Sequence, residues 1–322
     1  MIGYYVHHQG KGHLHRALSV SHELDLDVTG LSSLPRPEAW RGDWVQLDRD
    51  DTATTPTDVD ANGLLHWVPE RDPSISRRAA QLSRWFDEVR PAAMVSDVSV
   101  EAAVLARLHG IPVVSVALPG IRTDAAHDLG FGISRFIVAA WPEAARTMLV
   151  APSAADRISP VGAISRFPVV DAPAPAGKRV LVLGGAGGSG DQPFPIELAR
   201  EQTPGWHWDV LDQASWIDDP WELIRSAAVI VTHAGQNAIA EVSAARRPAI
   251  VLPQQRPFDE QLTTAAVLAA GNWPAIVRHA VPAAGWLELV ESAAALDGMT
   301  WSSWNDGRGA ERAARIIEQA AR

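Results

Sequence analysis

The chain contains no cysteine among its 322 residues. This absence excludes disulfide bonds, a thiol nucleophile and thiolate metal sites, and it is compatible with the cytosol. Basic residues are too few to balance the acidic ones, so the formal net charge is −10. We expect no nucleic-acid partner, because affinity for a phosphate backbone needs a clustered basic surface.

Long apolar runs are missing as well. No run approaches the roughly 18 residues that a membrane-spanning helix needs. Residues 1–13 predict a strand followed by a polar glycine loop rather than a signal peptide. With 47% hydrophobic and 20% charged residues, the composition is that of a globular protein. We therefore expect a cytoplasmic protein.

The length of the chain and one biased segment predict two domains. A chain of 322 residues exceeds a typical single core. Near residues 165–178, proline and alanine alternate without periodicity, as in a semi-rigid linker. We divide the chain into an N-terminal domain (1–165), a linker (166–178), a C-terminal domain (179–305) and a terminal helical segment (306–322).

The N-terminal domain begins like a doubly wound α/β domain. An apolar strand at 2–6 leads through a polar glycine turn into a helix at 13–24. Ligands bind at the carboxyl ends of such strands, so the turn around Gly12 is expected to face a cleft. The turn is not a dinucleotide fingerprint, because His15 stands where the third glycine would be.

Residues 229–261 carry the clearest chemical pattern. A buried strand breaks at His233 and Gly235 into a helix. The first backbone N–H groups of a helix have no partner within it, so a phosphate is a natural occupant, and Gly235 allows it to approach closely. Glu241 lies about two turns further along, where its carboxylate could accept from sugar hydroxyls.

A second glycine-rich loop follows the first strand of the C-terminal domain. Five of the seven residues 184–190 are glycine. So much backbone freedom is costly unless the main chain must approach another group closely. We expect that group to be a diphosphate.

This pattern resembles the donor-binding segment of GT-B nucleotide-sugar glycosyltransferases. The resemblance is strongest to the family 28 branch, which includes the peptidoglycan UDP-N-acetylglucosamine transferase, and extends to the UDP-glycosyltransferases. It implies an α/β fold of two Rossmann-like, doubly wound domains facing each other across a cleft, with the terminal helix packed back on the first domain. The donor-binding residues that it implies are Gly12, Gly184, Gly185, Gly187, Gly188, Ser189, Gln213, His233, Gly235, Gln236, Asn237, Glu241, Glu260 and Gln261.

The motif GxGHxxR, which ends at Arg16, resembles the N-terminal loop of the same enzymes. It also resembles that of the GT-B nucleotide-sugar hydrolase of pseudaminic acid synthesis, whose histidine is catalytic. Histidine changes charge near neutral pH, so His13 is the candidate general base. The alternative is that His13 caps its helix or binds phosphate. Asp97, at the end of a buried strand, is the candidate partner of His13, and its alternative role is to cap the following helix.

The resemblance implies an inverting, metal-independent glycosyltransferase that moves a sugar from a nucleotide diphosphate, with UDP expected, to an acceptor hydroxyl. We expect no cofactor and no metal site. Peripheral contact with the inner membrane face is expected if the acceptor is lipid-linked. The main alternative is a nucleotide-sugar hydrolase with the same fold and donor site. A UDP-sugar 2-epimerase fits less well, and a non-catalytic nucleotide-sugar sensor is a third class.

Overall fold

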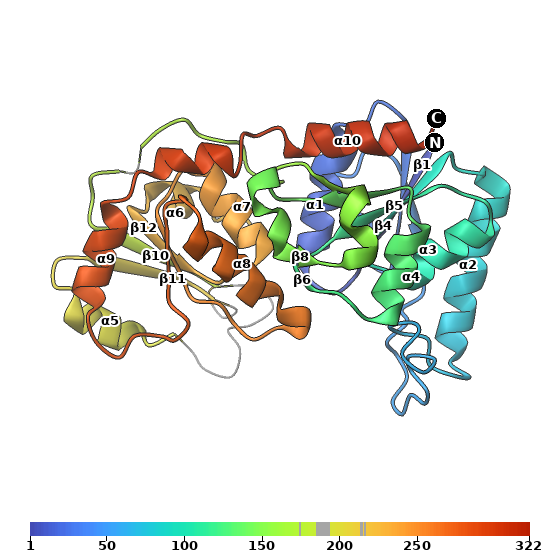
Figure 1. Cartoon of the computed structure of the whole chain (residues 1–322), viewed down its shortest axis with the longest axis horizontal. Coiled ribbons are helices and arrows are strands. Elements are labelled where there is room, and N and C mark those ends of the chain that lie inside the picture. Colours follow the sequence, from blue (N-terminus) through green and yellow to red (C-terminus); the bar gives the residue numbers. More distant parts are fainter. Residues whose placement is uncertain (174, 185–193, 213–214, 216) are drawn as a thin grey trace.

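The computed structural model describes residues 1–173, 175–184, 194–212, 215 and 217–322. Among these residues, no helix is long and apolar enough to cross a membrane. Strands and helices alternate along most of the chain, and its elements gather around two large parallel sheets (Figure 1).

The N-terminal sheet has seven parallel strands in the order β3-β2-β1-β4-β5-β7-β9. Its strands are β1 (Ile2–Val6), β2 (Val28–Ser32), β3 (Asp43–Gln46), β4 (Ala93–Asp97), β5 (Val113–Ala117), β7 (Phe136–Ala139) and β9 (Ile158–Pro160). A separate two-stranded sheet pairs β6 (Gly120–Ile121) with β8 (Leu149–Val150). The order reverses beside β1, and Val6 pairs with Asp97, so the ends of β1 and β4 lie together at this switch point.

The C-terminal sheet has five parallel strands in the order β11-β10-β12-β13-β14. Its strands are β10 (Arg179–Leu183), β11 (His207–Leu211), β12 (Val229–Thr232), β13 (Ala249–Val251) and β14 (Ala275–Val277). Leu183 pairs with Thr232, so the segments that follow β10 and β12 emerge side by side. The apolar residues of β10, β12 and β13 are buried, as expected for parallel strands covered on both faces, whereas β11 and β14 at the edges of the sheet are partly exposed.

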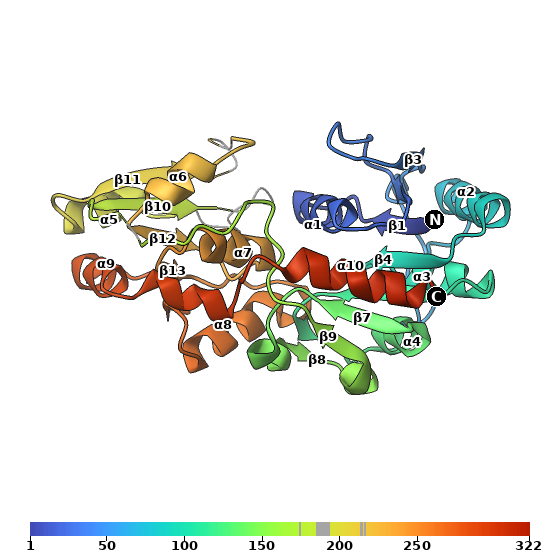
Figure 2. The same cartoon turned by 90° about the horizontal axis from the view of Figure 1, so that it is seen from above.

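Helices cover both faces of each sheet (Figure 2). They are α1 (Lys11–His22), α2 (Pro73–Val89), α3 (Val100–Leu108), α4 (Ala125–Ile133), α5 (Ile196–Gln202), α6 (Trp221–Ser226), α7 (Gln236–Ala244), α8 (Glu260–Ala270), α9 (Trp286–Ala294) and α10 (Gly309–Ala320). Short 3₁₀ segments are η1 (Glu143–Met148), η2 (Pro152–Arg157), η3 (Pro257–Asp259) and η4 (Gly298–Ser303). Asp72, Ser99 and Asp124 cap α2, α3 and α4 with their side chains.

The terminal helix α10 lies against the N-terminal half of the molecule, beside α1 (Figure 1). Ala313, Ile317 and Ala320 are buried in the same core cluster as Ile2 and Val114. The two chain termini lie close together in both views. The last helix and the first strand of the chain therefore share one hydrophobic core. The domain boundaries given above remain a prediction.

Candidate active site

The switch point of the N-terminal sheet brings His13 and Asp97 together. Asp97 ends β4 and is fully buried, and His13 lies in the first turn of α1. Nδ1 of His13 is 2.8 Å from Oδ1 of Asp97. When Nδ1 donates its proton to the carboxylate, Nε2 of the neutral ring carries a lone pair and can accept a proton from another group.

The capping role considered for each of these two residues does not match the local structure. Gly10, with φ 86°, is the N-cap of α1, and no side chain caps that helix. The N-cap of α3 is Ser99, whose side chain accepts from the backbone N–H of Ala102. His13 and Asp97 thus pair with each other rather than capping the helices beside them.

Arg16 is the third member of this group. Its Nε and Nη2 donate to the two oxygens of Asp97 at 3.0 and 2.7 Å, and its Nη1 donates to Oε1 of Gln236 at 2.7 Å. Burial alone would raise the pKa of Asp97, but Arg16 and His13 together hold that pKa well below its ordinary value. Sequence reasoning placed Arg16 in the motif without a role, because neither partner is near it in the chain.

Arg16 also bears on which ring nitrogen of His13 carries the proton. Its Nη2 lies 3.1 Å from Nδ1 of His13, and a guanidinium can only donate. A hydrogen bond from Arg16 to Nδ1 would need the opposite tautomer from the one that donates to Asp97. Because Nη2 also has the charged oxygen of Asp97 at 2.7 Å, we assign the Nδ1 proton to the His13–Asp97 bond.

The other wall of the site is the start of α7. Gly235 is the N-cap of this helix, no side chain caps it, and the first turn holds no acidic residue. A Cβ atom at Gly235 would meet nothing within 4 Å, so the space in front of the helix start is open. Gln236 and Asn237 begin the helix, and their unpaired N–H groups make this end a suitable anion site.

His233 is oriented by a backbone carbonyl. Its Nδ1 donates to the oxygen of Leu252 at 3.0 Å, which leaves Nε2 as the nitrogen available to a ligand. Burial lowers the pKa of His233. The neutral ring can therefore offer only a lone pair at Nε2, so His233 would have to gain a proton to bind a phosphate.

Glu241 is buried and paired. Nε of Arg166 donates to its Oε1 at 2.8 Å, and Nη1 of Arg166 donates to the backbone oxygen of Asp218 at 2.8 Å. Burial raises the pKa of Glu241, an effect that Arg166 opposes. Arg166 lies in the predicted linker and was missed by sequence reasoning, since a linker composition gives no sign of an ion pair 75 residues along the chain.

A cleft of about 800 Å³ runs between these walls. Of the predicted donor-binding residues, those that line it are Gly12, Gly184, His233, Gly235, Gln236, Asn237, Glu241 and Gln261. His13 lies between two lining residues, Gly12 and Leu14, and its side chain is 15% exposed. Five further predicted positions, Gly185, Gly187, Gly188, Ser189 and Gln213, lie outside the described residues.

Glu260, the remaining predicted donor-binding residue, does not line the cleft. It accepts from Nη2 of Arg122, which follows β6 in the N-terminal half of the chain, at 2.5 Å. Burial lowers the pKa of Arg122, so this guanidinium needs a counter-charge, and Glu260 supplies it. Glu260 lines a smaller cavity of about 190 Å³ instead of the cleft, although its neighbour Gln261 faces the cleft.

Two clusters among the described residues could hold a metal ion by composition: His66, Asp124 and His127, and His8, Asp50 and Asp51. In the first, Arg122 donates to Nε2 of His127, so Nδ1 carries the proton that it donates to Asp124. In the second, Arg49 donates to both oxygens of Asp51. Side-chain atoms of His127, Asp124 and Asp51 are thus committed to hydrogen bonds that a metal ion would have to break.

Comparison with known proteins identifies the C-terminal part of the chain. Residues 172–281 match the Glycosyltransferase family 28 C-terminal domain. A protein described as an uncharacterized glycosyltransferase of Methanopyrus kandleri is 29% identical over 129 residues, which are 38% of this chain. The match spans 35% of that relative's length. The resemblance of the donor segment to family 28 is confirmed.

Solved structures match the whole chain. MurG of Acinetobacter baumannii superposes with a TM-score of 0.65 at 15% identity and covers 99% of both chains. The Phytolacca americana enzyme UGT2, solved with UDP-2fluoro-glucose and pterostilbene, gives 0.60 at 14% identity over 100% of this chain and 99% of that one. At such identities the likeness establishes the fold, and the predicted GT-B architecture is confirmed.

Proposed function

We propose that this chain, whose residues 172–281 form a glycosyltransferase family 28 C-terminal domain, transfers a sugar from UDP to an acceptor hydroxyl. The reaction inverts the anomeric carbon and uses no metal ion. The observation that carries the proposal is the hydrogen-bonded group of His13, Asp97 and Arg16, joined through Gln236 to the open start of α7.

In this proposal His13 is the general base. Its Nδ1 is held by Asp97, so Nε2 accepts the proton of the acceptor hydroxyl while the oxygen attacks the anomeric carbon. The bond from that carbon to the diphosphate breaks, and UDP departs with the bonding electrons. The fully buried Asp97 stabilises the imidazolium that forms, in the way a carboxylate supports a catalytic histidine.

The start of α7 receives the negative charge of the leaving group. Its free N–H groups and helix dipole point at the cleft, and Gly235 leaves them uncovered. Fixed donors of this kind stabilise charge as it develops without any reorganisation, which is the role a metal ion has in other transferases. Glu241 is the candidate for the ribose hydroxyls, and Gln261 for the sugar.

The choice of UDP is supported by the match to family 28 and by the fold shared with an enzyme solved with UDP-2fluoro-glucose. Calorimetric titration with UDP, dTDP and GDP tests it directly. We expect UDP to bind most tightly. Equal affinity for all three nucleotides would contradict a uridine-specific site.

Replacement of His13 tests the catalytic assignment. We expect His13→Ala to lower turnover of a UDP-sugar about 10²- to 10⁴-fold, because general-base catalysis contributes that much, while UDP affinity changes little. His22→Ala is the matched control, since His22 lies exposed at the far end of the same helix. Unchanged turnover in His13→Ala would remove the base assignment.

The GxGHxxR motif also favours a hydrolase, in which water takes the place of the acceptor. The same base would then activate water, so the residues alone do not separate the two reactions. Incubation with UDP-sugar and no acceptor distinguishes them: fast release of free sugar indicates hydrolysis, whereas a slow release that an added alcohol outcompetes indicates transfer.

A further inference from the structure

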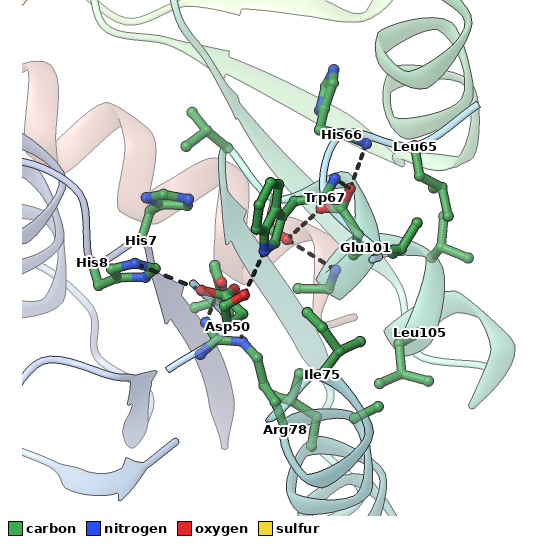
Figure 3. Close-up of a pocket in the computed structure, with 18 of the residues that line it drawn as sticks. His7, His8, Asp50, Leu65, His66, Trp67, Ile75, Arg78, Glu101 and Leu105 are labelled. Atoms are coloured by element: carbon green, nitrogen blue, oxygen red, sulfur yellow. Dashed lines mark hydrogen bonds and ion pairs between the residues drawn. The ribbon is translucent and has the colours of Figure 1, made fainter. Parts of the chain in front are cut away.

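A third cavity, here called the apolar pocket, opens on the N-terminal half of the molecule (Figure 3). It has a volume of about 460 Å³, within the range of small-molecule sites. The end of β1, helices α2 and α3 and the segment 50–68 surround it. Its apolar walls include Leu65, Trp67, Ile75, Leu82, Val104 and Leu105.

The charged side chains that line the described part of this pocket all have partners. Arg78 donates to the hydroxyl of Tyr5 and lies 3.4 Å from Asp50. Oε1 of Glu101 accepts from the backbone N–H groups of His66 and Trp67 at 2.8 and 3.1 Å. Asp51 is held by Arg49. A charged ligand would lose its water here without finding an unpaired counter-charge, which is unfavourable.

The end of the pocket nearest the cleft is polar, and its two carboxylates, Asp50 and Asp51, lie 3.6 and 3.3 Å from Nε2 of His8. Burial lowers the pKa of His7 to about 3, so the ring is neutral at physiological pH. The rings of His7 and His13 lie 5.5 Å apart, centroid to centroid. His8 lines both the apolar pocket and the cleft. A molecule in the pocket can therefore extend a polar group toward His13.

The opposite rim is open and apolar. Leu108, at the end of α3, lines the pocket and is 78% exposed. Val98, which follows Asp97 directly, also lines the pocket and has φ 64°, a conformation that a β-branched residue adopts only when its surroundings enforce it. The pocket wall and the Asp97 carboxylate thus share one constrained piece of backbone.

We infer that the apolar pocket binds the body of the acceptor, and that this body is an uncharged hydrocarbon or aromatic group whose hydroxyl reaches His13. The inference rests on the proposed transfer reaction and adds the chemical class of the acceptor. A carbohydrate acceptor would leave most of its hydroxyls without partners against these walls. An apolar alcohol buries its body and presents a single polar group at the His7 end.

Binding of simple alcohols tests the inference without any sugar donor. Calorimetric titration with 1-butanol, 1-hexanol and 1-octanol should show Kd falling about fourfold for each added methylene, the gain expected from burying it. The carboxylates and primary amines of the same chain lengths should bind at least about tenfold more weakly, because their charge is desolvated without a partner.

Two substitutions on one helix provide a matched comparison. Ala79 is half-buried on α2 and lines the pocket, whereas the next residue, Ala80, is exposed and does not. Ala79→Phe fills the pocket and should abolish the dependence of Kd on chain length, while Ala80→Phe should retain it. If Ala79→Phe does not fold, Leu105→Ala serves instead and should weaken 1-octanol binding about tenfold by removing apolar wall.

Titration of each variant with UDP separates the two proposals. UDP binding that persists in Ala79→Phe while alcohol binding is lost supports a distinct acceptor pocket. Alcohol binding without any UDP binding would overturn the proposed function, although the apolar pocket would still be a binding site for alcohols. Carboxylates or amines that bind as tightly as the alcohols, no effect of chain length in the unmodified protein, or equal behaviour of the two phenylalanine variants would each overturn the inference.

Discussion

Asp97 accepts hydrogen bonds from two side chains at once. Arg16 binds both of its oxygens, and His13 shares one of them. A fully buried carboxylate with a single arginine is already neutralised, so its support of a protonated His13 is weaker than that of an unpaired aspartate would be. Arg16 also donates to Gln236, at the start of α7. The charge of Asp97 and Arg16 is therefore linked by a hydrogen bond to the helix start where the leaving group is proposed to bind.

The buried charge pair predicts a large effect of removing one partner. Arg16→Met should lower the free energy of unfolding by about 3–5 kcal/mol, because it leaves the buried Asp97 carboxylate without its arginine and with only the hydrogen bond to His13. Urea unfolding followed by circular dichroism measures this loss. The double variant Arg16→Met/Asp97→Leu should lose much less than the sum of the two single variants, since it removes both charges together. Additive losses would show that the pair is not coupled.

Local sequence patterns indicated some candidate site residues but not their partners. The GxGHxxR motif and the strand that ends at Asp97 indicated two side chains at neighbouring strand ends, which the sheet register brings together. The ion pairs of Arg166 with Glu241 and of Arg122 with Glu260 join residues far apart in the chain. No periodicity encodes such contacts, so they could not be read from one sequence.

At the scale of elements, the starts of α1 and α7 approach each other across the cleft. A Cβ atom on Gly12 would lie 1.9 Å from Nδ2 of Asn237, far inside contact distance. Gly12 is helical and has no positive φ, so its requirement is space rather than backbone conformation. Because Gly12 has no side chain, the side chain of Asn237 has room at the start of α7.

Gly12→Ala should consequently weaken UDP binding by displacing the Asn237 side chain. We expect a loss of about tenfold, the value of one to two hydrogen bonds, with little change in stability because alanine favours helix. Calorimetric titration measures the affinity. Asn237→Ala should cause a similar loss, and the double variant should be no worse than Asn237→Ala alone, because the steric conflict disappears with the side chain. Two independent losses that add would contradict this account.

Element positions were predicted well where burial is complete and less well at their ends. The apolar runs of β1, β4, β10 and β12 mark parallel strands because both faces of these sheets are covered. The helix predicted at 13–24 is α1, Lys11–His22, since Gly10 sets its start with a positive φ. Helix α9, Trp286–Ala294, likewise begins after a glycine with a positive φ, Gly285 at 83°. Such glycine conformations are decided by tertiary contacts.

At the scale of the molecule, the resemblance to a known family predicted the architecture. The two sheets and the match to GT-B structures confirm it. What the resemblance could not supply is how the two halves contact each other. Lys11 with Asp218, Arg16 with Gln236 and Arg122 with Glu260 all join the two halves, so charge pairs and hydrogen bonds contribute to their alignment.

Three histidines predict how the stability of the whole molecule depends on pH. Burial is the main cause that lowers the pKa of His7 to about 3, and those of His15 and His127 to about 4. Unfolded histidine has a pKa of about 6.5. Between these pKa values the unfolded chain binds more protons than the folded chain does. The stability that the neutral rings contribute is therefore present above about pH 6.5 and is lost as the pH falls toward 4.

The free energy of unfolding should thus decrease between pH 6.5 and 4.5, by up to about 1.4 kcal/mol per pH unit for His7 and by less for His15 and His127, whose pKa values are lowered less. Urea unfolding at half-unit pH intervals measures the slope. His7→Asn keeps an acceptor for the backbone N–H of Gln9, which His7 receives at 3.1 Å, but carries no titrating ring. Its slope should be shallower in this window and equal to that of the unmodified protein at pH 8. An unchanged slope below pH 6.5 would mean that the His7 ring is protonated in the folded protein, which would place a positive charge at the end of the apolar pocket that faces His13.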